Sequence, residues 1–510
     1  MNNKRIITLI IPVVLLVVSC TKLDEDLRSD IPRSEADKLA NVNALLKATY
    51  DGLQLPFQDQ ANVWALQEHS TDEAIPPTRA GDWDDNGVWR VLHTHTWNAD
   101  HTYVRDVFNN LLGVTFNATN VLSFKPTAQQ AAEAKFLRAL AMYTVLDLYN
   151  QVPFREPGEN LLNAPKVLKG LDALNFIITD LNAIIPDLPA NSQAYVANKD
   201  AAKVLLMKCY LNKGVYAKRD APTFDAADMN QVITLADQIT ATTKYNLSAN
   251  FYDNFAPNNA DISKELIFTQ QNGPGINRNG NSARSRYYCT LHYKSPIPGG
   301  GWNGFTTLSD FYDKFEATDK RRGDSYPGFT DSSGLKVGLL LGQQFDKNGN
   351  ALTDRSGSRP LSFTREIKLI ETGANLEVTG IRVVKYVPDL YNGDNVNNDY
   401  VFFRYADVLL MKAEALVRTN AAAAALPIVN SIRTKRLASA LATVTLDNLL
   451  DERGRELYWE SWRRQDLIRF GKFLQPFQEK PNTSGKERLV YPIPNAALAV
   501  NPNLEQNTGY

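Results

Sequence analysis

The chain has 510 residues, of which 44% are hydrophobic and 22% are charged. This composition is typical of globular proteins with a sizeable core and excludes a disordered chain. Lysine and arginine total 55 against 56 acidic residues, so no excess of positive charge exists to bind a nucleic-acid backbone. Three cysteines, at positions 20, 209 and 289, are too few and too scattered for a disulfide framework or a cysteine-rich zinc site.

The first twenty residues have the pattern of a bacterial signal peptide. After a charged start, the mainly apolar stretch 6–18 is shorter than the roughly 20 residues that a membrane-spanning helix needs. The stretch runs into the sequence LVVSC at 16–20, which resembles a lipobox, whose cysteine receives a diacylglyceryl group. We therefore predict a lipoprotein signal peptide over residues 1–19 and acylation of Cys20.

Residues 20–33 are predicted to form a lipidated linker after the signal peptide. Their acidic cluster Asp24-Glu25-Asp26 resembles the export signal of surface lipoproteins in Bacteroidetes-type bacteria. For the first twenty residues two other interpretations stay open, namely an ordinary cleaved signal peptide and an apolar anchor in which the cysteine is incidental.

Residues 34–240 are predicted to form an N-terminal helical scaffold. The clearest pattern lies in 128–149, where mainly apolar residues recur on one face of a helix. Further helices are expected at 34–54, 99–122, 168–185, 199–213 and 226–241. Cys209 shares an apolar helix face, so we expect it to be buried rather than reactive.

Residues 241–400 are predicted to form an irregular insertion of loops and short strands. They contain 17 of the 28 glycines, about twice the share that their length would give. The Asn-Gly pair within 345–350 predicts a hairpin turn. Asp346, Asn348 and Asn350 could be taken for a calcium loop, but the glycine and the final acid that an EF-hand requires are missing, so calcium is not expected there.

Residues 401–510 are predicted to form a C-terminal helical part with a closing signature. Helices are expected at 402–419, 421–437 and 447–473. The third contains six acids and six bases between 447 and 472, a balance typical of a structural helix with ion pairs. Glu452 and Glu456 lie one helical turn apart beside arginines, so we expect ion pairing rather than the facing carboxylates of a glycosidase.

Four segments of the C-terminal third resemble motifs of the SusD/RagB family of outer-membrane nutrient-uptake lipoproteins. They are FRYADVLLMKAEA at 403–415, ERGREL and WRRQDLIR at 452–457 and 462–469, YPIP at 491–494, and NPNLEQNTGY at 501–510. Thr508 stands where the family usually has proline. A helix at 134–148 is also similar to a family motif, so the resemblance covers nearly the whole chain.

The resemblance implies a mainly α fold, with four tetratricopeptide-like helix pairs as a scaffold and an irregular insertion that carries the ligand surface. It implies a non-catalytic, surface-exposed outer-membrane lipoprotein without a cofactor. Such a protein captures a glycan and delivers it to a TonB-dependent transporter of the SusC type, on which it sits as a lid. Capture of a peptide is the alternative within the family, and a glycoside hydrolase is a more distant one.

Two aromatic loops are the candidate glycan site. The loop 64–97 contains Trp83 and Asp84 in a glycine-containing polar stretch, with Trp89 and Arg90 close behind, and a second glycine-rich stretch carries Trp302 and Asn303. Indole faces stack on sugar rings, and neighbouring polar groups hydrogen-bond hydroxyls. We predict that Trp83 and Trp302 share one exposed surface, whereas burial is the stronger expectation for Trp64, Trp89 and Trp97.

A cluster of His93, His95, Asp100 and His101 could supply metal ligands. Hydrogen-bonded structural histidines are the simpler interpretation, and no metal is expected. The sequence leaves open whether Cys209 and Cys289 are paired.

Overall fold

A computed structural model describes residues 41–277 and 280–510. The signal peptide predicted over 1–19, Cys20, the linker 20–33 and the first part of the helix expected at 34–54 lie outside the described residues.

Long helices are the main regular elements of the described chain. They are α6 (Thr102–Leu122), α7 (Ala128–Tyr149), α8 (Gly170–Ile184), α9 (Lys199–Ala217), α10 (Ala226–Thr240), α15 (Tyr405–Arg418), α16 (Ala422–Lys435) and α17 (Leu446–Leu457). Shorter helices are α2 (Val42–Asp51), α3 (Gln54–Gln58), α4 (Val63–Glu68), α5 (Arg90–His93), α11 (Asn259–Ile262), α12 (Ser285–Tyr288), α13 (Ser309–Tyr312), α14 (Phe329–Ser333), α18 (Arg463–Arg469) and α19 (Asn495–Val500). Single 3₁₀ turns are η1 (Asp85–Gly87), η2 (Phe251–Phe255), η3 (Lys320–Arg322) and η4 (Lys486–Leu489).

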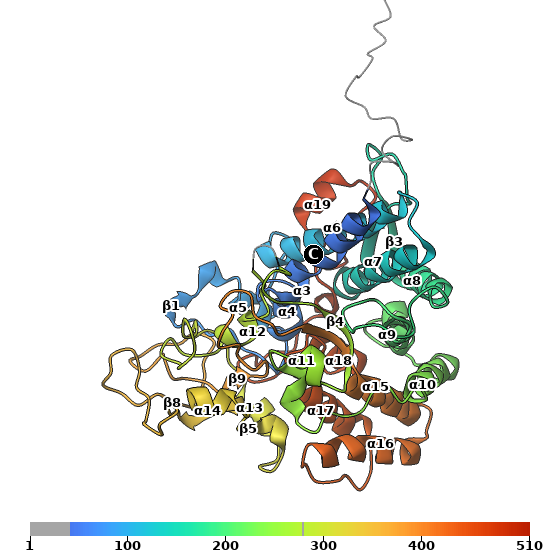
Figure 1. The fold of residues 1–510 in the computed structure, drawn as a ribbon. Coiled ribbons are helices and arrows are strands. Elements are labelled where there is room, and N and C mark those ends of the chain that lie inside the picture. The colour runs from blue at the N-terminus through green and yellow to red at the C-terminus, as the bar shows by residue number, and fades with distance from the viewer. Residues whose placement is uncertain (1–40, 278–279) are drawn as a thin grey trace, which may run out of the picture. The chain divides into compact units, whose positions relative to one another are not determined.

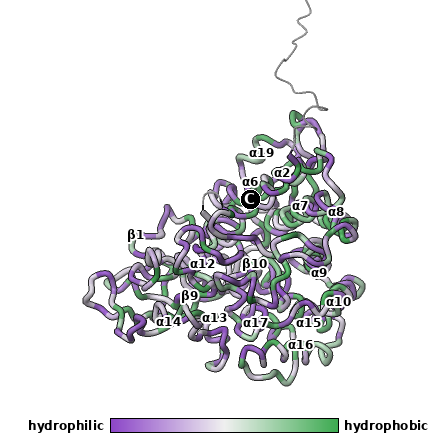
Figure 2. Tube along the Cα trace, viewed as in Figure 1, coloured by the Kyte–Doolittle hydropathy of each residue, from purple (hydrophilic) through white to green (hydrophobic). Residues whose placement is uncertain are grey.

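The long helices pack in a row that follows chain order. Each of α6 to α10 contacts the next, then α10 contacts α15, and α15 contacts α16 (Figure 1). Hydrophobic and hydrophilic residues are interspersed along these helices (Figure 2). The helices α6, α8 and α10 bury one face, whereas α7 is buried on all sides from Phe136 to Tyr149. The fold is therefore mainly α and tetratricopeptide-like, as the sequence predicts.

Local sequence signals set the ends of the best-predicted helix. A capping box of Thr127 and Gln130 opens α7, and Asn150 closes it in the left-handed conformation with φ of 62°. The structure confirms α7 over 128–149 as expected, and most of the other predicted helices agree within a few residues. The exceptions are the helix at 447–473 and the helix at 34–54, of which the described part is α2, ending at Asp51, with α3 as a separate helix after it.

The prediction of one helix over 447–473 is wrong, because the chain turns between α17 and α18. Trp459 and Ser461 adopt left-handed conformations there, with φ of 61° and 66°. Their backbone N–H groups donate to carboxylates that come from the other end of the chain, Trp459 to Glu73 at 3.2 Å and Ser461 to Glu68 at 2.6 Å. Burial raises the pKa of Glu68 to about 7. Tertiary hydrogen bonds thus override a continuous helical pattern.

Short antiparallel strands organise the irregular part of the chain. They are β1 (Ala80–Trp83), β2 (Gln151–Phe154), β3 (Lys166–Lys169), β4 (Leu266–Gln270), β5 (Gly323–Asp324), β6 (Val337–Leu340), β7 (Gly342–Gln343), β8 (Ser362–Phe363), β9 (Arg382–Val384) and β10 (Tyr400–Arg404). β2 pairs with β3, β7 with β8, and β6 lies between β5 and β9. The hairpin turn predicted within 345–350 is confirmed by the pairing of Phe345 with Ala351.

The pair β4 and β10 joins the two ends of the insertion. Leu266 lies opposite Arg404 and Gln270 opposite Tyr400, so the chain leaves and re-enters the helical scaffold at one place. Between these strands the chain forms β5 to β9 and α12 to α14, which lie with β1 away from α8, α9 and α10 (Figure 1).

A buried carboxylate links four separate parts of the chain. Glu456 of α17 accepts hydrogen bonds from Arg404 of β10 at 2.7 Å, from Arg436 after α16 at 2.9 Å, and from Arg321 of η3 at 3.0 Å. All four side chains are at most 1% exposed. Glu456 therefore ion-pairs as the sequence predicts, but with distant arginines and inside the core.

Glu452, one turn earlier in α17, extends this network. It accepts from Arg321 at 2.7 Å, from Arg433 at 2.6 Å and from Arg455 at 2.7 Å. Burial alone would raise the pKa of Glu452, but the three guanidinium groups lower it to about 2. The carboxylate stays ionised, so it cannot serve as a catalytic acid.

We predict that Glu456→Gln lowers the free energy of unfolding by roughly 3 kcal/mol or more, because it leaves buried arginines without their carboxylate. Urea denaturation measures this change. Glu505→Gln is the matched control, because Glu505 forms an exposed ion pair with Lys169 at 2.7 Å, and the expected loss of stability there is much smaller than in Glu456→Gln. Equal losses in both variants would contradict the role assigned to the buried network.

The same ion pairs predict a loss of stability in acid. The pKa values of Asp407, Glu414 and Glu452 are each lowered to about 2, since nearby cations outweigh the effect of burial. Carboxyls with depressed folded-state pKa values stabilise the fold above their ordinary values of 3.8 to 4.5. We expect the unfolding free energy to fall steeply as pH drops from about 4.5 towards 2. A constant value across this range, measured by urea titration, would contradict the prediction.

Candidate functional site

The two predicted aromatic loops meet in the structure. The backbones of Ile75 and Thr306 pair as an antiparallel bridge, which sets the loops side by side. The indole N–H of Trp83 donates to the carbonyl oxygen of Trp302 at 3.0 Å. Two segments more than 200 residues apart thus form one unit.

Trp83 is half-buried and packs mainly on the second loop. Its ring centroid lies 4.6 Å from that of Phe305 and 5.9 Å from that of Trp89. A Cβ atom at Gly304 would lie 2.5 Å from Cε2 of Trp83, so only glycine lets the indole approach this backbone. Trp83 therefore acts as a support beneath the loop that carries Trp302.

Trp302 is half-buried and belongs to an aromatic and cationic stack. Its ring is inclined at 30° to that of Tyr288, with centroids 5.5 Å apart, and the guanidinium of Arg284 lies 5.8 Å from its centroid. Burial raises the pKa of Tyr288, although Arg284 opposes this effect, and the protonated hydroxyl donates to the carbonyl of Pro298. Part of the Trp302 indole remains open to solvent.

Backbone hydrogen bonds hold the Trp302 loop in place. The amide of Trp302 donates to Tyr288 O at 2.6 Å, and that of Gly304 to Cys289 O at 2.8 Å. A Cβ atom at Gly301 would lie 1.9 Å from the carbonyl oxygen of Leu291, so glycine is required for this close approach. The indole is thus held in position before any ligand binds.

The other predicted site residues lie around these two tryptophans. Trp89 is 2% exposed and donates from its indole N–H to Asp85 at 2.6 Å, and Asn303 is 1% exposed. Asp84 and Arg90 form a partly exposed ion pair of 2.8 Å. Trp89 and Asn303 are therefore too buried to contact a ligand at the surface, whereas the side chains of Asp84 and Arg90 are accessible there.

The burial predicted for the other two tryptophans of this region is confirmed. Trp64 is 1% exposed and Trp97 is 2% exposed. Trp64 packs on Phe305 with centroids 5.7 Å apart, and Trp97 donates to the hydroxyl of Tyr510 at 2.7 Å. Both belong to the core under the loops.

The clustered histidines are buried and hydrogen-bonded to backbone carbonyls. His93 contacts His69 O at 3.1 Å, His95 contacts Ser70 O at 2.8 Å, and His101 contacts Val88 O at 2.8 Å. Burial lowers the pKa of His93 to about 4, so this ring is neutral. Residues 41–277 and 280–510 contain no group of three or more His, Cys, Asp or Glu side chains placed to hold a metal.

Cys209 and Cys289 are both free and buried. Burial raises the pKa of each thiol, so neither is a reactive thiolate.

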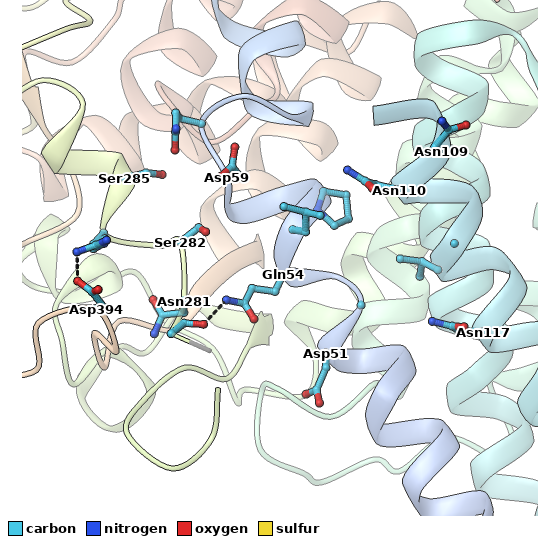
Figure 3. A pocket seen from close by; sticks show the side chains of 18 of the residues that line it. Asp51, Gln54, Asp59, Asn109, Asn110, Asn117, Asn281, Ser282, Ser285 and Asp394 are labelled. Carbon is cyan, nitrogen blue, oxygen red and sulfur yellow. Dashed lines mark hydrogen bonds and ion pairs between the residues drawn. The ribbon is translucent and has the colours of Figure 1, made fainter. Parts of the chain in front are cut away.

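A polar groove of about 690 Å³ has Trp302 in its lining. Figure 3 shows the polar side chains that line it. Its walls come from the α2–α3 segment, from α6 and from the start of α12 with the loop before it. The polar lining residues are Asp51, Gln54, Asp59, Gln60, Asn109, Asn110, Asn117, Asn281, Ser282, Arg284, Ser285 and Asp394. Trp302 is the one aromatic residue among the residues that line the groove.

Two cross-links fix the walls of the groove relative to each other. Gln54 of α3 donates to the carbonyl of Gly280 at 2.6 Å (Figure 3), and Ser285 of α12 donates to Gln58 O at 3.0 Å. The groove can therefore stack a flat apolar face on Trp302 and bind hydroxyl groups with amides and carboxylates.

Sequence reasoning missed Tyr288, Arg284 and the whole α6 wall. The stack on Trp302 depends on a fold contact that no local pattern indicates. One signal was present in α6, where Gly113 stands alone near the middle of a 21-residue helix.

The profile of the family described as the SusD family matches residues 264–510. The protein named "Starch-binding protein SusD" from Bacteroides thetaiotaomicron is 25% identical, over 91% of this chain and 85% of its own length. The C-terminal part of the chain thus matches the SusD family, and the chain is similar to SusD over most of its length. The C-terminal segments that resemble family motifs include residues of α15, α17 and α18, which are joined by buried ion pairs. The remaining two segments are the stretches of chain directly before and after α19.

Solved structures of SusD-like proteins share the fold. A SusD superfamily protein from Parabacteroides distasonis superposes with a TM-score of 0.72 at 18% identity, over 92% of this chain and 98% of that one. The surface glycan-binding protein A from Bacteroides thetaiotaomicron, in complex with laminarihexaose, gives a TM-score of 0.66 at 17% identity, over 91% and 98%. The SusD protein and the surface glycan-binding protein A from Bacteroides thetaiotaomicron are named as binding proteins rather than as enzymes.

No helix within 41–277 and 280–510 combines the length and the apolar character needed to cross a membrane.

Proposed function

We propose that this SusD-like protein is a non-catalytic glycan-binding lipoprotein of the outer-membrane surface. The observation that carries the proposal is the half-buried Trp302, which is packed on Tyr288 at the edge of a polar groove. A fixed aromatic face beside hydroxyl-binding groups is the arrangement that carbohydrate recognition requires. The starch-binding and laminarihexaose-bound relatives support the same ligand class.

In this proposal the two tryptophans have different roles. Trp302 stacks on a sugar ring, and Trp83 holds the Trp302 loop through its hydrogen bond and its contact with Gly304. Trp89 and Asn303 support the loops from within, and the Asp84–Arg90 pair offers polar groups at the surface.

We further propose that acylation of Cys20 anchors the protein and that its partner is a SusC-like TonB-dependent transporter, to which it delivers the glycan. The support is the lipobox-like sequence and the match to the SusD family. No cofactor enters the proposal, because stacking and hydrogen bonding suffice for capture.

We predict that Trp302→Ala weakens glycan binding about five- to tenfold, because a stacked ring contributes on the order of 1 kcal/mol. Isothermal titration with the tightest-binding oligosaccharide from a polysaccharide screen measures the change. Phe345→Ala is the control, since Phe345 is an exposed aromatic residue that does not line the groove. Unchanged affinity of Trp302→Ala, with circular dichroism showing a folded protein, would defeat the assignment of Trp302.

The variant Trp83→Phe tests whether Trp83 supports the Trp302 loop or contacts the glycan itself. The variant keeps an aromatic ring but loses the N–H group that donates to Trp302 O. We expect a smaller loss of affinity than in Trp302→Ala, together with a lower melting temperature.

We predict that Cys20→Ala abolishes acylation and releases the protein from the membrane fraction. Metabolic labelling with a fatty acid and membrane fractionation check this outcome, and co-purification of a barrel protein with the wild type tests the proposed partner. A processed variant that stays membrane-bound, with no label on the wild type, would contradict the anchor.

A further inference from the structure

We propose that the groove selects an extended, uncharged glycan that runs from Trp302 across α3 to the face of α6, and that its acidic lining rejects anionic glycans. This inference rests on the proposed function and adds the class of glycan and the path that it takes. It depends on three features of the groove, which are the α6 wall, a gap in that wall, and the charges along the lining.

The α6 wall presents amide groups on one helix face. Residues at i, i+3, i+4 and i+7 share a face, and here they are Asn110, Gly113, Val114 and Asn117. Asn110 and Asn117 point from α6 towards α3 (Figure 3). Asn110 donates to Asn62 at 2.8 Å, which leaves its own oxygen as an acceptor. The side chain of Asn117 makes no hydrogen bond within the described chain, so both its donor and its acceptor groups are available for hydroxyls.

Gly113 leaves a gap between these two amides. It is exposed, it adopts a helical backbone, and a Cβ atom built on it would meet nothing within 4 Å. Glycine inside a helix is less stable than alanine, and no turn or packing contact at this position requires it. Its effect is to let a ligand approach the helix backbone between Asn110 and Asn117.

The α2–α3 segment packs against α6 below this gap. A Cβ atom at Gly52, between α2 and α3, would lie 3.6 Å from Cγ2 of Val114, so the two segments are in contact there. Together with the Gln54 and Ser285 cross-links to the opposite wall, this contact gives the ligand a fixed trough. A preformed trough loses little entropy when it binds an extended chain.

The lining carries an excess of negative charge. Arg284, the one basic lining residue, is paired with Asp394, and Asp51 is paired with Lys47 at the rim at 2.6 Å. Asp59 accepts hydrogen bonds from the amide of Ala61 at 2.7 Å and from Asn62 at 3.4 Å, and within the described residues it has no ion-pair partner. A uronate or sulfate group in the groove would face this carboxylate across a partly desolvated space and be repelled. Neutral sugars carry no such penalty.

The test begins with affinity gel electrophoresis of the wild type against two sets of polymers. The neutral set is starch, laminarin, xylan and galactomannan, and the anionic set is alginate, polygalacturonate and carrageenan. We expect retardation by a neutral polymer and none by an anionic one. Retardation by anionic polymers alone overturns the inference but leaves glycan binding intact, whereas no retardation by any polymer overturns the proposed function as well.

Substitutions at Gly113 then locate the ligand. We expect Gly113→Leu to weaken titration with oligosaccharides of the retained polymer about tenfold or more, because a branched side chain fills the gap. Gly113→Ala should retain affinity within about threefold and raise the melting temperature. Ala183→Leu, at an exposed position of α8 outside the groove, is the matched control for the added side chain. Wild-type affinity in a folded Gly113→Leu protein overturns the path across α6.

Asp59→Asn tests the charge filter separately. Asparagine keeps an acceptor oxygen for the amide of Ala61 but removes the charge. The probe pair is the retained neutral oligosaccharide and the same oligosaccharide after partial carboxymethylation. We expect the ratio of the affinity for the carboxymethylated form to the affinity for the neutral form to be about three- to tenfold higher in the variant than in the wild type. Equal discrimination by both proteins overturns the filter.

Discussion

Three arginines from separate parts of the chain converge on the carboxylate of Glu456, and the arrangement of the remaining elements depends on that meeting. Arg404 lies in the strand that closes the insertion, Arg436 follows α16, and Arg321 belongs to the insertion itself. A buried charge without its partners is costly, so the network accepts only one relative placement of these segments. The family motifs therefore supply the buried ion pairs that fix the fold. This explains why the motifs identify the fold but not the ligand.

The candidate site depends on a different constraint, which is the close approach of two backbone segments. Trp302 is held because its loop runs against residues 288–292 at distances that only glycine permits at 301 and 304. Trp83 fills the space behind it, and the groove in front is lined by residues from both the scaffold and the insertion. Rigidity at the tryptophan and polarity in the groove together give a surface suited to sugars.

Periodicity and capping predicted most of the helical fold, because these signals act within a few residues of sequence. The bounds of α7 follow from its capping box and its left-handed end. The break between α17 and α18 was not predictable, since its stabilising carboxylates, Glu68 and Glu73, lie nearly 400 residues away. For the same reason the sequence predicted two aromatic loops on one surface but not the hydrogen bond and ring packing between them, and it did not indicate that α6 forms one wall of the groove. Only the isolated Gly113 marked that helix as unusual.

The pairing of β4 with β10 has a consequence for how the sequences of such proteins diverge. A segment that leaves and re-enters a scaffold between two paired strands can change in length or sequence without displacing the helices. The groove has one wall on each side of this boundary, since α3 and α6 belong to the scaffold and Trp302 to the insertion. Changes of sequence within the insertion can therefore alter the Trp302 wall of the groove and leave the α3 and α6 walls in place.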